Sequence, residues 1–142
     1  MDAKLLTMKL ADHFYVALDC ENTVELAQFY AQITGLRIET FGASLNQSVE
    51  FIELRDEQDI PKLAFQRIEN YVAPTWPTGN VPQQAHLDFA VKDLIKSEAE
   101  VLKLGATKSQ FQPGSPKNDN YSTEFIVYLD PAGHPFCLIQ RD

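Results

Sequence analysis

The sequence has few positive charges and few cysteines. Its 142 residues include 12 Lys and Arg against 20 Asp and Glu, so the formal net charge is −8 with the histidines neutral. An acidic chain is repelled by nucleic-acid phosphates and by anionic membrane surfaces, which argues against both as partners. The two cysteines, Cys20 and Cys137, are far apart in the sequence. This usage predicts buried thiols in a reducing compartment, and therefore a cytoplasmic protein.

Several familiar signals are also missing. No window approaches the roughly 20 apolar residues that a membrane span needs, and residues 1–10 do not have the apolar run of a signal peptide. The chain contains no glycine-rich phosphate loop, no Cys-x-x-Cys pair and no Gly-x-Ser-x-Gly nucleophile motif. The remaining composition, 44% apolar and 23% charged, predicts one globular domain over residues 1–142, large enough to bury a core.

The sequence repeats itself. Residues 50–67 align with residues 124–141 at a shift of 74, and seven of the eighteen positions are identical, where chance alone would give roughly one. Upstream, the match continues more faintly at shifts of 69 and 70. We interpret the chain as two copies of one unit, over about residues 11–68 and 84–142.

Each copy predicts the same order of elements: a strand, a helix and three further strands. The predicted strands are 14–20, 37–40, 49–54 and 62–67 in the first copy, and 85–91, 107–111, 125–129 and 136–140 in the second. The helices are expected to begin after N-caps Thr23 and Asp93 and to end at Gly35 and Gly105. Their predicted apolar stripes are Leu26, Ala27, Phe29, Tyr30 and Ile33 in the first helix, and Leu94, Ile95, Ala99 and Leu102 in the second. Residues 112–120 form a polar loop.

One helix can cover only one face of a four-stranded sheet. The other face must line a cavity or be covered by a partner chain. The predicted fold class is therefore α+β, with two tandem βαβββ repeats forming a curved mixed sheet around a concave pocket.

Three motifs carry a family resemblance. They are Ala27-Gln28-Phe29-Tyr30 before Gly35-Leu36, His86-Leu87-Asp88-Phe89, and the turn Asp130-Pro131-Ala132-Gly133 before the last strand. With the repeat, they make nearly the whole chain resemble the vicinal oxygen chelate superfamily, which includes glyoxalase I, extradiol dioxygenases and bleomycin-binding proteins. The stretch Pro74-Thr75-Trp76-Pro77, followed by Pro82-Gln83-Gln84, is similar to its glyoxalase-like domain branch.

The resemblance implies a divalent metal held by His, Gln or Glu from the first and last strands of each repeat. Carried over position by position, the four slots hold Ala17, Leu63, His86 and Cys137. Two of these residues cannot bind a metal, and His with Cys alone is an incomplete site. The sequence therefore predicts a degenerate site with no metal and no cofactor.

Polar residues near the superfamily's site remain candidates for function. Side chains alternate along a strand, so Asp88 is expected to share the cavity face with His86, and Asp19 is expected there by the repeat. His86 is the candidate catalytic group. Such a pocket could perform acid/base chemistry, bind a cation or bind a hydrogen-bonding ligand. The aspartates could equally tie down backbone, with His86 a satisfied buried histidine.

The expected pocket also has apolar residues. Cys137 and Ile139 fall on one face of the last strand and are predicted to form its wall. Trp76, the only tryptophan, lies just upstream of His86, where it would either close over the mouth or fill the gap between the repeats.

Two main functions fit these residues. The first is binding of a small organic molecule, such as a drug or metabolite. The alternative is a lyase, isomerase or dioxygenase of the superfamily type, acting with an atypical metal site or by metal-free acid/base chemistry through His86. A third is a degenerate scaffold acting through dimerisation. The missing ligands favour the first, and a homodimer is expected because twofold contacts are the commonest closed arrangement.

Overall fold

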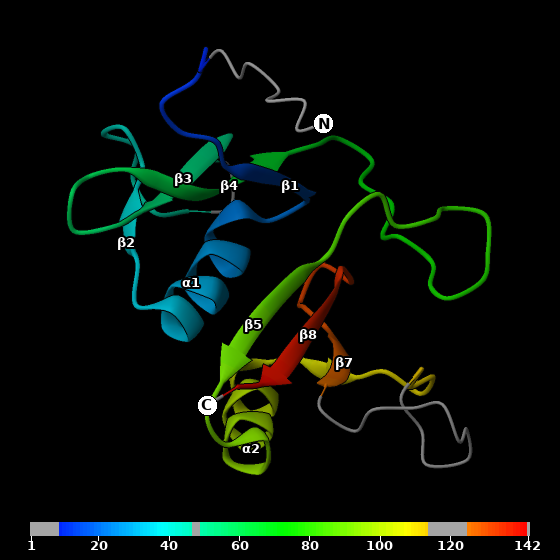
Figure 1. Cartoon of the computed structure of the whole chain (residues 1–142). Helices are drawn as coiled ribbons and strands as arrows, with labels where there is room; N and C mark the ends of the chain where they lie inside the picture. The colour runs from blue at the N-terminus through cyan, green and yellow to red at the C-terminus, as the bar shows by residue number, and fades with distance from the viewer. Residues whose placement is uncertain (1–8, 47–48, 114–124, 142) are drawn as a thin grey trace, which may run out of the picture.

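The computed structural model describes residues 9–46, 49–113 and 125–141 and shows two modules that follow one another along the chain (Figure 1). The first module contains β1 (Val16–Cys20), α1 (Thr23–Thr34), β2 (Arg37–Glu39), β3 (Phe51–Arg55) and β4 (Pro61–Arg67). The second contains β5 (Leu87–Val91), α2 (Leu94–Leu104), β6 (Thr107–Lys108), β7 (Phe125–Leu129) and β8 (Pro135–Gln140). The polar loop predicted at 112–120 lies mostly outside the described residues.

Each module forms a four-stranded mixed sheet. The strand orders are β1-β4-β3-β2 and β5-β8-β7-β6. The first strand of each module pairs in parallel with the last, and the other pairs are antiparallel. The structure therefore confirms the α+β class and the tandem βαβββ units. Among the described residues the two sheets are separate and do not close, which leaves β1 and β5 as sheet edges.

The ends of the helices follow local hydrogen bonding. Asp93 caps α2 as predicted, but α1 is capped by Asn22, whose side chain accepts the backbone N–H of Glu25. Thr23 is instead the first helical residue, and its buried hydroxyl donates to the carbonyl oxygen of Val49 at 2.6 Å. The predicted cap was wrong by one residue because Thr23 is engaged by another segment of the chain. Gly35 ends α1 at a φ of 73°, a conformation that glycine adopts without strain.

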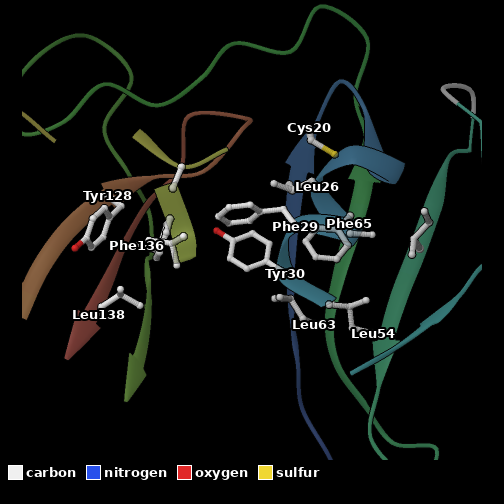
Figure 2. Packing of buried hydrophobic residues seen from close by; sticks show 14 of the residues in the cluster. Cys20, Leu26, Phe29, Tyr30, Leu54, Leu63, Phe65, Tyr128, Phe136 and Leu138 are labelled. Carbon is white, nitrogen blue, oxygen red and sulfur yellow. The ribbon is translucent and has the colours of Figure 1, made fainter. Parts of the chain in front are cut away.

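α1 lies between the two sheets and contributes to the packing of both (Figure 2). The ring of Tyr30 stacks on Phe65 of the first sheet and on Phe89 of the second, with centroid separations of 5.8 Å in both cases. Phe29 meets Phe136 of β8 edge-on at 5.7 Å. Buried residues of both modules consequently form one continuous hydrophobic cluster.

α2 packs less deeply. Leu94 and Val101 are buried, whereas the predicted stripe residues Ile95 and Leu102 are 86% and 40% exposed and Ala99 is also exposed. The predicted stripe was wrong for these three residues because α1 already covers part of the second sheet. Within the described residues, neither helix has the length and apolar character that crossing a membrane requires.

Candidate functional site

The sheet face turned away from the helices carries the candidate site, and we call it the open face of each module. In the second module, Leu87 and Phe89 pack against the hydrophobic cluster. Alternation along the chain therefore turns His86 and Asp88 to the open face. Cys137 lies between the buried residues Phe136 and Leu138 of β8 and points the same way as Asp88.

Three polar groups meet on this face. The parallel pairing of β5 with β8 places Asp88 directly beside Cys137. The His86 Nε2 atom lies 3.2 Å from Asp88 Oδ1, and one donor atom from each of the three residues falls within 4.8 Å of the others. The side chains of His86 and Asp88 are 43% and 49% exposed, whereas Cys137 is only 6% exposed. Two accessible polar groups thus surround a thiol that is fixed in the sheet.

The thiol of Cys137 is a weak acid. Burial, and after it the neighbouring Asp88 carboxylate, raises its pKa to about 12. Cys20, buried in the first module, also has a pKa raised to about 12, chiefly by burial. A thiol with such a pKa carries almost no thiolate at neutral pH and is a poor nucleophile. The site therefore does not have the character of a cysteine-based catalyst.

The repeat register differs from the one that the sequence predicts. Superposing the helix caps pairs Asn22 with Asp93, a shift of 71. At this shift Tyr15, and not Ala17, is the counterpart of His86, while Ala17 matches Asp88. The faint match at a shift of 69, which pairs Leu18-Asp19 with Leu87-Asp88, was therefore misleading.

The counterpart of Cys137 also changes. A register irregularity between Leu54 and Arg55 adds one residue to β4. Beyond it the repeat shift becomes 73, so Ala64 matches Cys137, while Leu63 turns inward and is only 4% exposed. The superfamily's four slots thus hold Tyr15, Ala64, His86 and Cys137. Because Ala64 has no donor atom, the chain does not fit the four-ligand metal site of the superfamily.

The open face of the first module carries a different polar group. Glu53 is 5% exposed and accepts hydrogen bonds from Arg55 Nη2 at 2.7 Å and Nε at 2.9 Å. A hydrogen bond to the Glu53 carboxylate raises the pKa of Tyr15. Arg55 also contacts Asp59 and lies over the ring of Phe41. Sequence reasoning missed this cluster, although the alternation of Glu53 and Arg55 within a strand was a visible signal.

The other predicted site residues lie in separate places. Ile139 follows Cys137 by two residues on β8 and shares its face. Asp19 belongs to the first sheet, where its backbone oxygen accepts a hydrogen bond from His134 Nε2 at 2.7 Å. Trp76 packs edge-on against Phe111, with ring centroids 5.4 Å apart. The structure therefore groups His86 with Asp88, Cys137 and Ile139, and places Asp19 on the other module.

A cavity of about 440 Å³ lies at the junction of the modules. Its lining includes Glu21, Glu25 and Arg67 of the first module and Pro131 of the second, and it does not include the three donors. The open face of the second module is thus an accessible surface distinct from this cavity.

Comparisons with known proteins agree on the fold. A glyoxalase/bleomycin resistance protein/dioxygenase family enzyme from Burkholderia phytofirmans PsJN is 17% identical, with a TM-score of 0.58 over 89% of this chain and 95% of that one. The fosfomycin resistance protein FosX from Mesorhizobium loti is 16% identical, with a TM-score of 0.58 over 92% of both chains. The oxidase ChaP-H2 is 17% identical, with a TM-score of 0.55 over 94% of this chain and 96% of that one.

These neighbours have the arrangement seen here at low sequence identity, so they are evidence for the fold alone. No curated protein sequence matches this chain. The sequence does match the glyoxalase-like domain family over residues 15–139, which takes in every helix and nearly every strand residue described above. Together with the two βαβββ modules, this match shows that the chain belongs to the glyoxalase-like domain family.

Proposed function

We propose that this chain binds a small organic molecule on the open face of its second module. The observation that carries the proposal is the convergence of His86, Asp88 and Cys137 on a sheet face that neither helix covers. Ile139 adds an apolar wall next to them. Small-molecule sites commonly combine apolar walls with a few convergent polar groups, which is the character of this face.

The chemistry of the site narrows the ligand only in part. Asp88 and the net charge of −8 favour neutral or cationic molecules over anions. The neighbouring structures include a resistance protein and an oxidase, so the shared fold does not select one ligand or one reaction. We further propose that the protein is cytoplasmic, because its two cysteines are free thiols.

We also propose that the chain functions as a homodimer. Among the described residues, β1 and β5 pair with another strand on one side only, and Phe14, just before β1, is 91% exposed. An exposed strand edge offers backbone groups with which another chain can pair, and an exposed apolar side chain beside it adds surface to bury. A second copy would enclose the open face and bring polar groups of the first module, such as Asp19, toward the ligand. Light scattering at micromolar concentration should give twice the monomer mass, and the monomer mass would contradict this proposal.

The experiment for binding is a thermal-shift screen of neutral and cationic metabolites, with chelator present, followed by NMR of the best compound. The compound should shift the signals of His86 and Ile139 most strongly. Its affinity should fall at least tenfold in His86→Ala and Asp88→Asn. The matched control is His13→Ala, an exposed histidine before β1. Equal loss of affinity in the control, or signals that shift only elsewhere, would contradict the proposed site.

A second candidate function is metal-free acid/base catalysis through His86. The specific observation is its contact with Asp88 at 3.2 Å, because a carboxylate on Nε2 orients the imidazole and leaves Nδ1 to take a proton. A ligand with a C–H bond next to a carbonyl group would then exchange that hydrogen with deuterated solvent. Exchange that is catalysed by the protein and abolished in His86→Gln supports this function. Binding without exchange leaves the protein as a binder.

A further inference from the structure

We propose that His86, Asp88 and Cys137 form a binding site for a thiophilic divalent cation, with Zn²⁺ the best match. The ligand set lies wholly within the second module, and Asp88 occupies none of the superfamily's four ligand slots. The site shares His86 and Cys137 with those slots, but it completes the ligand set with Asp88 and needs no residue of the first module. It goes beyond the proposed function, since a small molecule can bind this face without a metal.

The geometry requires little adjustment. One donor atom from each residue already lies within 4.8 Å of the other two, and His86 Nε2 is 3.2 Å from Asp88 Oδ1. Tetrahedral zinc with bonds of about 2.0–2.3 Å brings its donors to roughly 3.5 Å from one another. The largest separation must therefore shrink by no more than about 1.3 Å. The exposed side chains of His86 and Asp88 can supply this movement by rotation, while Cys137 stays fixed between two buried neighbours.

The donor set selects the class of cation. Zinc accepts a mixture of imidazole nitrogen, carboxylate oxygen and thiolate sulfur, whereas Mg²⁺ and Ca²⁺ prefer ligands that are all oxygen. A thiolate at Cys137, a carboxylate at Asp88 and a neutral His86 carry two negative charges, which a divalent cation balances. Three protein ligands leave one coordination position open toward solvent.

The electrostatics of the pair are consistent with metal binding. Without a cation, burial and the Asp88 carboxylate oppose ionisation of Cys137 and raise the pKa of its thiol. A cation bound between the two groups would instead lower the pKa of the thiol, because the thiolate and the carboxylate would then both contact a positive charge. Binding should therefore release the thiol proton, with one proton lost for each metal bound near neutral pH.

The repeat offers an internal comparison. The equivalent positions on the first module hold Tyr15, Ala17 and Ala64, of which the two alanines have no donor atom. The fold itself therefore does not require polar residues at these positions. The convergence of three donors in the second module alone is a property of its side chains.

The test is titration of the purified full-length chain with Co²⁺ and with Zn²⁺ after treatment with chelator. Cobalt should produce the near-ultraviolet absorption of a thiolate ligand, and calorimetry should give one Zn²⁺ per chain with release of one proton. Cys137→Ala should abolish the cobalt absorption. His86→Ala and Asp88→Asn should weaken zinc binding at least tenfold. The matched controls are His13→Ala and Asp12→Asn, which change an exposed histidine and an exposed aspartate that precede β1.

Sub-stoichiometric zinc binding by the unmodified chain, or binding unchanged in all three variants, would overturn the inference. Asp88→Asn alters an exposed side chain, so it keeps the test valid if Cys137→Ala does not fold. The two proposals fail separately. If a compound binds in the presence of chelator but zinc does not bind, only the metal site is contradicted. If zinc binds but no compound binds, only the small-molecule site is contradicted.

Discussion

The two modules have the same fold but use their open faces differently. In the first, Glu53 is held by Arg55 and Tyr15, and Arg55 reaches Asp59 as well. The charges of Glu53 and Arg55 are therefore already paired with protein groups. In the second, His86 and Asp88 contact each other but remain nearly half exposed beside Cys137. The two modules therefore keep the same scaffold but carry different polar residues on their open faces, and our proposals concern the second module.

The modules also differ in how their helices pack. α1 contributes Phe29 and Tyr30 to a junction that joins both sheets. α2 buries only Leu94 and Val101 among its residues. The stability of the chain should therefore depend more on residues at the α1 junction than on their counterparts elsewhere. Paired substitutions at equivalent positions test this asymmetry.

The largest difference is expected between Phe136→Ala and Leu63→Ala. These residues occupy equivalent positions on β8 and β4, but Phe136 also contacts the rings of Phe29 and Tyr30 across the junction. Loss of the buried phenylalanine should lower the free energy of unfolding by about 3–5 kcal/mol, and loss of the leucine should cost less, about 2–3 kcal/mol. Urea unfolding followed by circular dichroism measures both. A larger loss of unfolding free energy in Leu63→Ala would contradict the prediction that the stability of the fold depends most on the junction.

The next comparison removes one hydroxyl from each of two buried tyrosines. Tyr30 donates to the buried carboxylate of Asp130 at 2.6 Å, and Tyr128 donates to Glu98 at the same distance near the surface. Tyr30→Phe removes the hydroxyl that donates to Asp130 Oδ2 in the interior and should cost about 1–3 kcal/mol. In Tyr128→Phe water can replace the lost partner, because Glu98 is 26% exposed, so the loss should be about 1 kcal/mol or less. Equal losses in urea unfolding would contradict the difference in burial.

Much of the fold could be read from the sequence because the repeat is most visible where the backbone is most constrained. Asp56 and Asp130 begin matching turns, and each carboxylate accepts backbone N–H groups from within its own turn. Because such a turn depends on its aspartate, both copies have Asp at this position, and the alignment around it was reliable. The strands and helices on either side then followed from their apolar patterns.

The register of the site could not be read in the same way. One extra residue in β4 turns Leu63 toward the hydrophobic cluster and Ala64 toward the open face. The shared prolines that begin both strands conceal this extra residue. Glu53 and Arg55 escaped notice for a related reason, since their repeat counterparts are the apolar Val127 and Leu129. Comparison of repeats draws attention to shared residues, whereas the candidate sites lie where the copies differ. The three donors could be grouped from strand parity, but their distances required the structure.

The helix caps should give smaller and equal effects. Asn22 and Asp93 each accept a backbone N–H three residues later. Replacement of either by Ala should lower the free energy of unfolding by about 1 kcal/mol. Urea unfolding of both variants measures this. If Asn22→Ala left the free energy of unfolding unchanged, Asn22 would not be the effective cap, and the predicted cap Thr23 would be favoured again.

The smallest expected effects lie in the pH dependence of the two matching turns, and there they differ in sign. Hydrogen bonds from the backbone of Ile60, and then of Gln58, outweigh burial and lower the pKa of Asp56. Burial at the junction outweighs its hydrogen bonds and raises the pKa of Asp130. An unfolded aspartate has a pKa of about 3.9. Ionised Asp56 therefore stabilises the fold above that pH and loses this contribution as the pH falls through its lowered pKa.

For Asp130 the sign is opposite, because the fold favours its protonated form. That contribution is complete below about pH 3.9 and is lost as the pH rises through the raised pKa. Comparison with Asp56→Asn and Asp130→Asn isolates each carboxyl, since all other titrating groups are common to the pair. As the pH falls from 7 to 3, the stability of the unmodified chain should decrease relative to Asp56→Asn and increase relative to Asp130→Asn. Urea unfolding across this range measures both differences. Changes of the same sign would contradict the prediction that burial shifts the pKa of Asp130 in the direction opposite to that of Asp56.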